Sequence, residues 1–331
     1  MSNVQIGFKW VDTGFTHPVD MDTVRFVLPG SNGVCIAGGQ DLAYLFRSTD
    51  YGVNWTNLGV QFAEQRLILV AYLGLNGSEK TWIAGTYPNG YMLRSVDDGL
   101  TWANIGAVVA GEDAAGAMIS LGNGVAISST SPNGHIIRST DWGASWTDLG
   151  DLFSESRIGA FVRLSSTYIL GGTIGSGKVI KSVDNGATWD NALGSIGEDN
   201  IQSLVFGKDN VLMGTTSDAA NGGRMFRSTD LGATWTRVAT QLGATETSVN
   251  NTSTDGLGNW AACTYPNGNI WHSFDNGVTW ESRGRQFLQT DFFNTQFVGN
   301  SPTETNIFLG GTTVGGSGKI LRSTTYVEGL L

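Results

Sequence analysis

The chain has 331 residues, including 47 Gly and 6 Pro, and its formal net charge is −10 at pH 7 with a pI near 4.7. This acidic balance argues against nucleic acid as a partner, because binding to phosphates needs a basic surface. No apolar run reaches the roughly 18 residues of a membrane-spanning helix, and the first ten residues (MSNVQIGFKW) lack the basic and apolar regions of a secretory signal. We therefore expect a protein that folds in the cytoplasm, with no membrane insertion.

An eight-residue pattern, S-x-D-x-G-x-x-W, recurs along the chain at a nearly constant spacing. Its serines lie 47, 44, 43, 46 and 45 residues apart, a period typical of propellers and other repeat arrays. A seventh, incomplete copy begins at Ser323 (STTYVEGLL) and has no Trp. The six complete copies occupy residues 48–55, 95–102, 139–146, 182–189, 228–235 and 273–280.

Each copy lies between short strand-like segments, and four such segments make up one repeat. In the second repeat they are residues 66–74, 80–86, 91–95 and 101–106, expected as the inner, second, third and outer strands. The other inner strands are expected at residues 24–28, 117–121, 160–164, 201–206, 247–252 and 292–298. The sixth of these, around SVNNTS, is unusually polar for a buried strand.

The segment KWVDTG at residues 9–14 matches the outer strands that follow the motif Trp elsewhere, such as WTNLG from Trp55. It therefore supplies the outer strand of the seventh repeat. We predict an all-β fold, a single seven-bladed β-propeller of four-stranded antiparallel blades whose ring is closed by the N-terminal strand. The expected divisions are 1–14 (outer strand of blade 7), 15–60 (blade 1), 61–107 (blade 2), 108–151 (blade 3), 152–195 (blade 4), 196–240 (blade 5), 241–286 (blade 6) and 287–331 (blade 7).

The repeated motif is expected to build a turn. Its Asp and Ser can accept hydrogen bonds from nearby main-chain N–H groups, its Gly permits a left-handed conformation, and its Trp covers the hairpin. Because the same residues recur in every repeat, we assign them a structural role rather than catalysis or metal binding. They are Asp50, Asp97, Asp141, Asp184, Asp230 and Asp275, with Trp55, Trp102, Trp146, Trp189, Trp235 and Trp280.

No metal site or cofactor is predicted from the remaining residues. His17, His135 and His272 are scattered along the chain, without the spacing of a metal cluster. Cys35 and Cys263 fall in units that another unit separates in the ring, so we expect buried thiols rather than a disulfide. Two buried thiols fit a protein that folds in a reducing compartment.

The motif resembles the Asp-box, or bacterial neuraminidase, repeat. That repeat occurs in sialidases, xyloglucan-active glycosidases, sortilin-type receptors and a photosystem II assembly factor, so the resemblance implies a propeller but no single activity. This chain departs from sialidases, which have six blades and a Phe/Tyr-Arg-Ile-Pro motif, because its nearest string is VRFVLP at residues 24–29. Nor does its sequence indicate the three-arginine clamp of those enzymes. Arg25, Arg66, Arg157 and Arg163 lie outside the motifs, and nothing in the sequence indicates that three of them converge.

A second set of recurring residues consists of Asp and Glu side chains. They lie nine to twelve positions after each Trp, in the loops between blades. We expect these carboxylates around the upper mouth of the central channel. There they would bind a hard cation or polar ligand, or act as an acid/base pair; alternatively they are solvated charges or caps of local turns. For an enzyme, the catalytic candidates are Glu64, Glu112, Glu155 and Glu198. The other ligand-binding candidates are Asp20, Asp22, Asp113, Asp199, Glu246 and Asp291.

Two tyrosines, Tyr87 and Tyr265, stand beside Pro-Asn-Gly in loops of the same face. Each is suited either to stacking on a sugar ring or to packing within its own turn. A sugar would be the ligand in the first case, and none is required in the second.

The favoured hypothesis is a non-enzymatic structural or interaction propeller, and specifically a phage virion protein of a tail or fibre that binds host-surface glycans. Such a protein folds in the host cytoplasm and acts outside the cell. One alternative is a glycoside hydrolase using a carboxylate pair on the upper face. The other is a cytosolic or photosystem-type assembly factor. Protein partners in an assembly, and glycans, are the expected partners, and the oligomeric state is left open.

Overall fold

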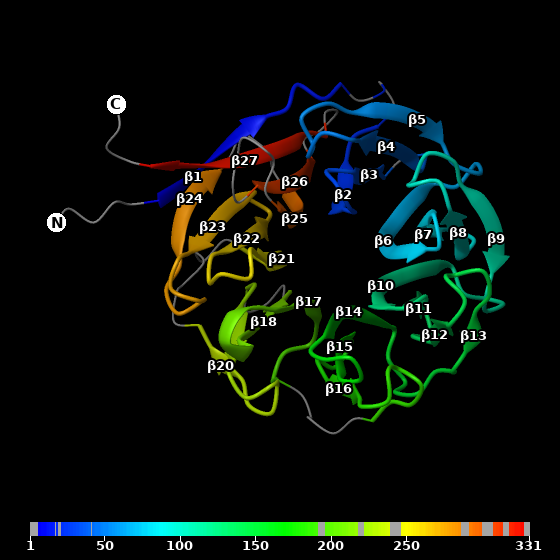
Figure 1. Ribbon diagram of the computed structural model, residues 1–331. Helices are drawn as coiled ribbons and strands as arrows, with labels where there is room; N and C mark the ends of the chain where they lie inside the picture. Colours follow the sequence, from blue (N-terminus) through cyan, green and yellow to red (C-terminus); the bar gives the residue numbers. More distant parts are fainter. Residues whose placement is uncertain are drawn as a thin grey trace.

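The computed structural model describes residues 6–16, 18, 21–40, 42–190, 196–217, 222–238, 246–285, 291–299, 307–313 and 318–327. Its strands form seven antiparallel sheets arranged as blades in a ring around a central axis (Figure 1). This is the predicted seven-bladed propeller, with essentially no helix. No helix in the described ranges is long and apolar enough to cross a membrane.

The first three blades each contain four strands in sequential order from the channel outward. Blade 1 contains β2 (Val24–Pro29), β3 (Cys35–Gly39), β4 (Tyr44–Ser48) and β5 (Thr56–Val60). Blade 2 contains β6 (Arg66–Asn76), β7 (Glu79–Tyr87), β8 (Tyr91–Ser95) and β9 (Ala103–Ala107). Blade 3 contains β10 (Ala114–Gly122), β11 (Val125–Ser131), β12 (Ile136–Ser139) and β13 (Thr147–Asp148).

The next three blades repeat this order. Blade 4 contains β14 (Arg157–Arg163), β15 (Ile169–Ile174) and β16 (Val179–Ser182), with a bridge from Lys181 to Asp190 in the place of the outer strand. Blade 5 contains β17 (Ile201–Phe206), the 3₁₀ turn η1 (Lys208–Asn210), β18 (Leu212–Thr216), β19 (Met225–Ser228) and β20 (Thr236–Arg237). Blade 6 contains β21 (Ser248–Thr254), β22 (Trp260–Tyr265), β23 (Asn269–Ser273) and β24 (Glu281–Arg285).

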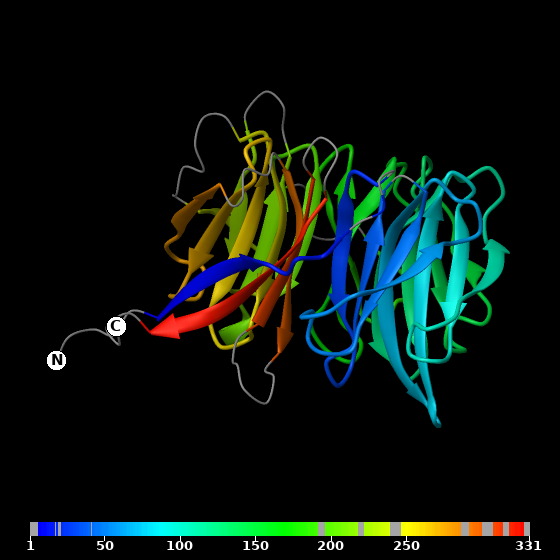
Figure 2. The same cartoon turned by 90° about the horizontal axis from the view of Figure 1, so that it is seen from above.

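Blade 7 joins the two ends of the sequence, as predicted. It contains β25 (Asp291–Gly299), β26 (Ile307–Thr313), β27 (Ile320–Val327) and, as its outer strand, β1 (Ile6–Asp12). Every residue of β1 pairs with β27, from Asp12 opposite Leu321 to Ile6 opposite Val327, and the pairing closes the ring. Figure 2 shows the two strands running together across the side of the ring.

The core is divided among the interfaces between neighbouring blades. Between blades 1 and 2, for example, Phe26 and Leu45 pack with Trp82 and Leu93, and all four are almost fully buried. Burying apolar surface contributes about 25 cal/mol per Å², so each blade is stabilised mainly by its two neighbours. Blade 7 has a four-stranded sheet only because β1 supplies its outer strand.

Each complete motif forms a closed hydrogen-bonded turn on what we call the lower face. In the fourth copy, Ser182 Oγ donates to Asp184 Oδ1 (2.8 Å) and accepts from Gly186 N (2.9 Å). Asp184 also accepts from Thr188 N (2.9 Å) and Thr188 Oγ1 (2.6 Å). Burial alone would raise the pKa of Asp184, but these hydrogen bonds outweigh it and lower the pKa to about 2. The carboxylate is thus committed to its own turn.

The glycine of this motif is required for two reasons. Gly186 has φ of +77°, a conformation that a side chain disfavours. A Cβ at this position would also lie 2.1 Å from Cδ1 of Ile127, which belongs to the neighbouring blade 3. The motif turn therefore packs directly against the next blade.

A basic side chain before the motif serine joins consecutive blades. Arg94 of blade 2, for instance, donates from Nε to the carbonyl of Trp142 in the motif turn of blade 3 at 2.8 Å. The same contact is made by Arg47 to Asp98, Arg138 to Asn185, Arg227 to Asn276 and Arg322 to Tyr51. These residues belong to the scaffold.

Candidate functional site: the upper loops and the central channel

The upper face carries the loops between blades and the loops between second and third strands. Glu112, which precedes the inner strand of blade 3, is 6% exposed. Its carboxylate accepts hydrogen bonds from Thr130 Oγ1 (2.6 Å), Asn133 N (3.2 Å) and Asn133 Nδ2 (2.5 Å). All three donors belong to the second strand and following loop of the same blade, so Glu112 holds that loop in place.

The equivalent glutamates of four other blades do the same. Their side chains are buried, and their partners lie in the corresponding loop. The contacts are Glu64 with Asn89 (2.7 Å), Glu155 with Lys178 (2.7 Å) and Ser176, Glu198 with Arg224, and Glu246 with Asn267 (3.2 Å) and Asn269. We expected these carboxylates around the channel mouth, but none of the five lines the central cavity. Each carboxylate is instead held by hydrogen bonds or an ion pair within its own blade.

The aspartate candidates occupy a different environment. Asp22, Asp113 and Asp199 are exposed, and the last two directly follow a buried glutamate in the sequence. Asp20 and the side chain of Asp291 lie outside the described residues. Among the residues described, no group of three or more His, Cys, Asp or Glu is placed to hold a metal ion.

The two candidate tyrosines also differ from each other. Tyr87 is half-buried, and the Arg66 guanidinium lies 4.3 Å from the centre of its ring, which fits a packing role within blade 2. Tyr265 is 44% exposed in the equivalent position of blade 6. Neither tyrosine lines the central cavity.

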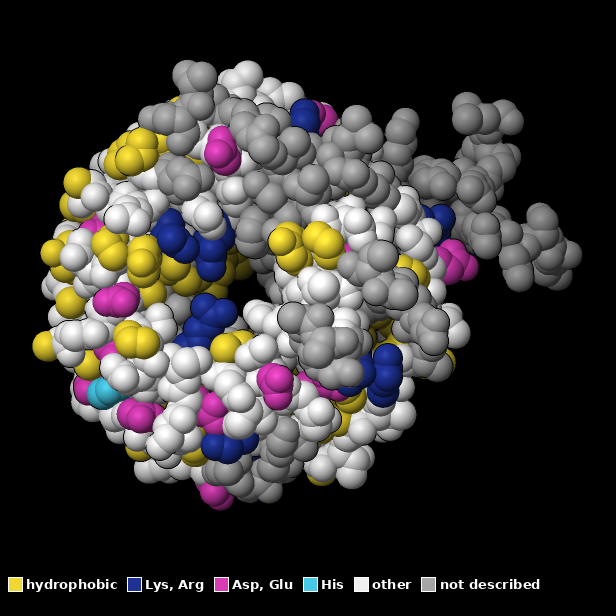
Figure 3. Space-filling model, turned by 180° about the vertical axis from the view of Figure 1, so that it is seen from behind, with side chains coloured by type: hydrophobic (Ala, Val, Ile, Leu, Met, Phe, Trp, Pro, Cys, Tyr) yellow, Lys and Arg dark blue, Asp and Glu magenta, His cyan; other side chains and the backbone are white. Residues whose placement is uncertain are grey.

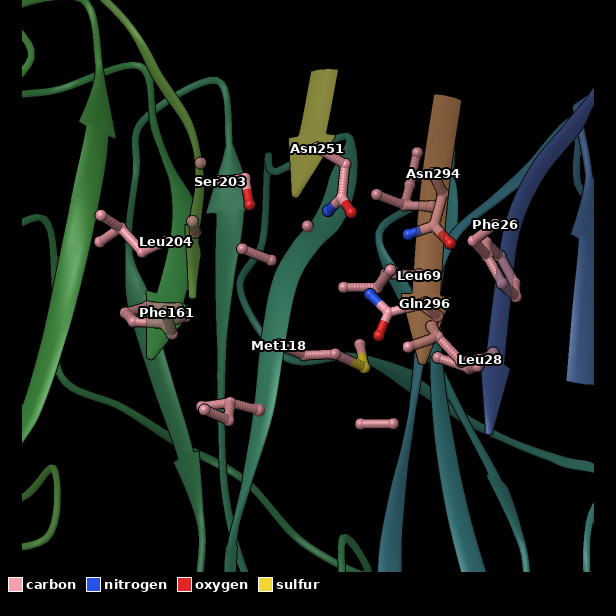
Figure 4. Close-up of a pocket in the computed structure, with 18 of the residues that line it drawn as sticks. Phe26, Leu28, Leu69, Met118, Phe161, Ser203, Leu204, Asn251, Asn294 and Gln296 are labelled. Carbon is pink, nitrogen blue, oxygen red and sulfur yellow. The ribbon is translucent and has the colours of Figure 1, made fainter. Parts of the chain in front are cut away.

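The central channel contains a cavity of about 630 Å³, lined by the inner strands of all seven blades. Its wall has two unlike arcs (Figure 4). The arc from blades 1 to 4 is mainly apolar, whereas the arc from blades 5 to 7 is mainly polar. The apolar arc includes Phe26, Leu28, Leu69, Met118 and Phe161, and the polar arc includes Gln202, Ser203, Asn250, Asn251, Asn294 and Gln296.

A β-bulge near the start of every inner strand shapes this wall. The pairing of each inner strand with the second strand skips one or two residues, at the same place in all seven blades. Bulges redirect side chains and are frequent beside functional sites. The skipped residues that line the cavity are Arg25, Ile68, Gly116, Ala117, Gly159, Gln202 and Asn250.

The charge of the lining has one sign. Its charged members are Arg25 in β2 and Arg157 in β14, and no Asp or Glu is present among the described lining residues. Figure 3 shows Lys and Arg side chains gathered around the central opening. Burial lowers the pKa of Arg157, because a desolvated guanidinium is less stable as a cation. The channel is therefore a basic site in a protein of net charge −10.

Sequence reasoning did not identify this site. Of the four arginines outside the motifs named above, Arg25 and Arg157 line the cavity, and Arg66 and Arg163 do not. The sequence feature that pointed to this cavity was the unusually polar inner strand of the sixth repeat, which contains Asn250 and Asn251. The bulges, which redirect the side chains, had no sequence signal of their own.

No family model and no curated protein matches the sequence. Among solved structures, "YCF48 bound to D1 peptide" is 17% identical with a TM-score of 0.68, covering 95% of this chain and 96% of that one. YCF48 from Cyanidioschyzon merolae is 16% identical with a TM-score of 0.67, covering 95% and 98%. An ancestral GH74 enzyme is 12% identical with a TM-score of 0.54, covering 90% of this chain and 59% of that one. At these identities the likeness shows the fold alone, which is that of a β-propeller.

Proposed function

We propose that the chain is an Asp-box propeller that works as a non-enzymatic interaction protein, binding a protein partner of an assembly on its upper face. The observation that carries this proposal is the commitment of Glu64, Glu112, Glu155, Glu198 and Glu246 to their own blades. The carboxylates hold the upper loops in fixed positions around a channel whose described lining has no acidic residue. This arrangement suits recognition rather than acid/base catalysis.

Membership of the Asp-box family is supported by the motif geometry. In all six complete copies the Ser hydroxyl donates to the Asp carboxylate and accepts from the Gly N–H. The Asp in turn accepts from the residue that precedes the Trp. The sequence pattern and the turn it builds therefore coincide in every repeat.

A protein partner is supported by the structure of YCF48 with D1 peptide, because that propeller matches this chain over nearly the whole length of both. The hydrolase alternative has the fold likeness to a GH74 enzyme in its favour and the geometry of the glutamates against it. The phage-virion hypothesis, glycan binding and cytoplasmic folding stay predictions, which neither the fold nor the likenesses support.

Site-specific photo-crosslinking tests the proposal. A photoreactive residue is placed on the upper face at Asp113 or Asp199, or on the lower face at Val183, where all three side chains are exposed. Crosslinking in cells of the source organism, followed by mass spectrometry, is expected to join one partner protein at the two upper positions and not at Val183. Reaction at Val183 alone would contradict the upper-face proposal.

A parallel assay tests for catalysis. The protein is incubated with a panel of polysaccharides, and new reducing ends are measured. We expect no turnover. Hydrolysis that disappears in Glu112→Gln or Glu155→Gln protein that is still folded, but persists in Asp113→Asn, would establish the hydrolase alternative instead.

A further inference from the structure

We propose that the central channel is a binding site for an organic carboxylate with an apolar body. The carboxylate would lie against the polar arc and its flanking arginines, and the apolar body against the arc of blades 1 to 4. This inference goes beyond the proposed function, since it holds whatever partner binds the upper face.

The amides of the polar arc have a fixed orientation. Asn251 Oδ1 accepts from Thr295 N of blade 7 (3.3 Å), and Asn294 Oδ1 accepts from Val27 N of blade 1 (3.4 Å). Because a backbone N–H can only donate, the oxygen end of each amide must face the neighbouring strand. The NH₂ end of each amide is left to face the cavity that both residues line. Figure 4 shows the two side chains in the wall of this cavity.

Arg157 supplies the positive charge. It lines the cavity, and no Asp or Glu forms an ion pair with it within the described part of the chain. A half-buried guanidinium without a carboxylate is costly unless another acceptor satisfies it. A ligand carboxylate can do so through two parallel hydrogen bonds, which are stronger than those between neutral groups.

The rest of the wall selects against other ligand classes. A free cation meets two arginines and no carboxylate in the described lining, so it is repelled. A fully hydrated anion such as inorganic phosphate would leave the partly exposed Leu28 and Leu69 of the lining in contact with water. A cavity of about 630 Å³ has the volume of a typical small-molecule site. The wall therefore fits an anion with attached apolar groups.

Methionine methyl NMR gives a direct readout, because Met118 lines the channel while Met92 and Met213 are buried between blades. The probe is N-acetylphenylalanine, compared with its neutral amide and with inorganic phosphate. We expect saturable shifts of the Met118 methyl with the acid, unshifted Met92 and Met213 signals, and affinity about tenfold lower for the amide. Unshifted Met118, or equal affinities for acid and amide, would overturn the proposal.

Substitutions locate the carboxylate. Arg157→Ala and Asn294→Asp are each expected to weaken binding about tenfold or more, since a hydrogen bond to a charged group is worth about 1.5–3 kcal/mol. Asn294→Asp is the sharper test, because it keeps an oxygen for Val27 N and replaces only the NH₂. Arg237→Ala, on the exposed outer strand β20, is the control and should bind normally.

Thermal unfolding shows whether each variant folds. If Arg157→Ala does not, Gln296→Glu places a negative charge in the same cavity and should also weaken binding. Affinity that is unchanged in the folded channel variants would place the site elsewhere. A peptide with a C-terminal Phe distinguishes two natural ligands, the C-terminus of a protein and a small organic acid. Binding tighter than that of N-acetylphenylalanine indicates a protein C-terminus, and weaker binding indicates a small acid.

Discussion

Trp10 donates its indole N–H to Nε2 of His272 at 3.3 Å, across the interface between the closing strand β1 and blade 6. Both side chains are buried, at 4% and 1% exposure, and they are 262 positions apart in the sequence. His272 takes the place of the arginine that precedes the motif serine in most blades. In five blades this arginine contacts the motif turn of the next blade. The motif of blade 7 is incomplete, and His272 of blade 6 contacts Trp10 of the N-terminal segment instead.

The His272 contact predicts a pH dependence of stability. Burial, and then repulsion by Arg283, lower the pKa of His272 from 6.5 to about 3. Between these values the unfolded chain binds the proton and the folded chain does not, so stability is retained above pH 6.5 and falls as the pH drops toward 3. Between the two pKa values, the free energy of unfolding falls by up to about 1.4 kcal/mol per pH unit for one such group.

Urea unfolding between pH 7 and 4.5 measures this slope. In His272→Gln the amide oxygen can still accept the Trp10 N–H, but no proton is taken up in this range. Its stability should depend less steeply on pH than that of the unaltered protein. Identical slopes would show that His272 is not held neutral in the folded state.

Trp10→Ala should destabilise the ring closure. Removing a buried aromatic side chain costs about 3–5 kcal/mol through lost burial and the cavity left behind. The effect should concentrate at blade 7, so hydrogen exchange is expected to speed up first along β1 and β27. The comparison is Trp102→Ala in blade 2, whose partly buried ring should cost less and leave exchange in β27 unchanged. Uniformly faster exchange throughout the ring would argue against a local seam.

Ser182→Ala tests the motif turn. The substitution leaves the buried Gly186 N–H without its acceptor, which should cost about 1–3 kcal/mol. Chemical denaturation measures the loss, and Thr140→Ala, at the variable second position of the preceding motif, is the control. A stability equal to that of the unaltered protein would show that the serine contact contributes nothing.

Glu112→Gln separates a structural role from a catalytic one. The new NH₂ group would face either Asn133 Nδ2 or the donors Thr130 Oγ1 and Asn133 N, so a buried donor meets a donor. We expect a loss of about 1–3 kcal/mol in the free energy of unfolding. Asp113→Asn, which alters the exposed neighbour, should change stability little. Equal stability of the two variants would contradict the loop-holding role of Glu112.

Much of the architecture follows from local sequence alone. The motif at a spacing of 43 to 47 residues, with alternating segments on either side, specifies one hairpin per repeat. Residues 9–14 match the segment after a motif Trp, which is enough to predict that β1 completes blade 7. These features are readable because turn chemistry and strand alternation act over a few residues.

The candidate site could not be read in this way. Glu112 and Asp113 are adjacent in sequence and look alike, yet one is buried against Asn133 and the other is exposed. Which carboxylate turns inward depends on the loop that closes over it about 20 residues later. Arg157 and Asn294 meet in one cavity only because the ring brings blades 4 and 7 around a common channel. The sequence by itself therefore determined the repeat, the turns and the closure, because local interactions specify them. Burial and convergence of side chains were decided by the tertiary structure, because they depend on contacts between distant segments.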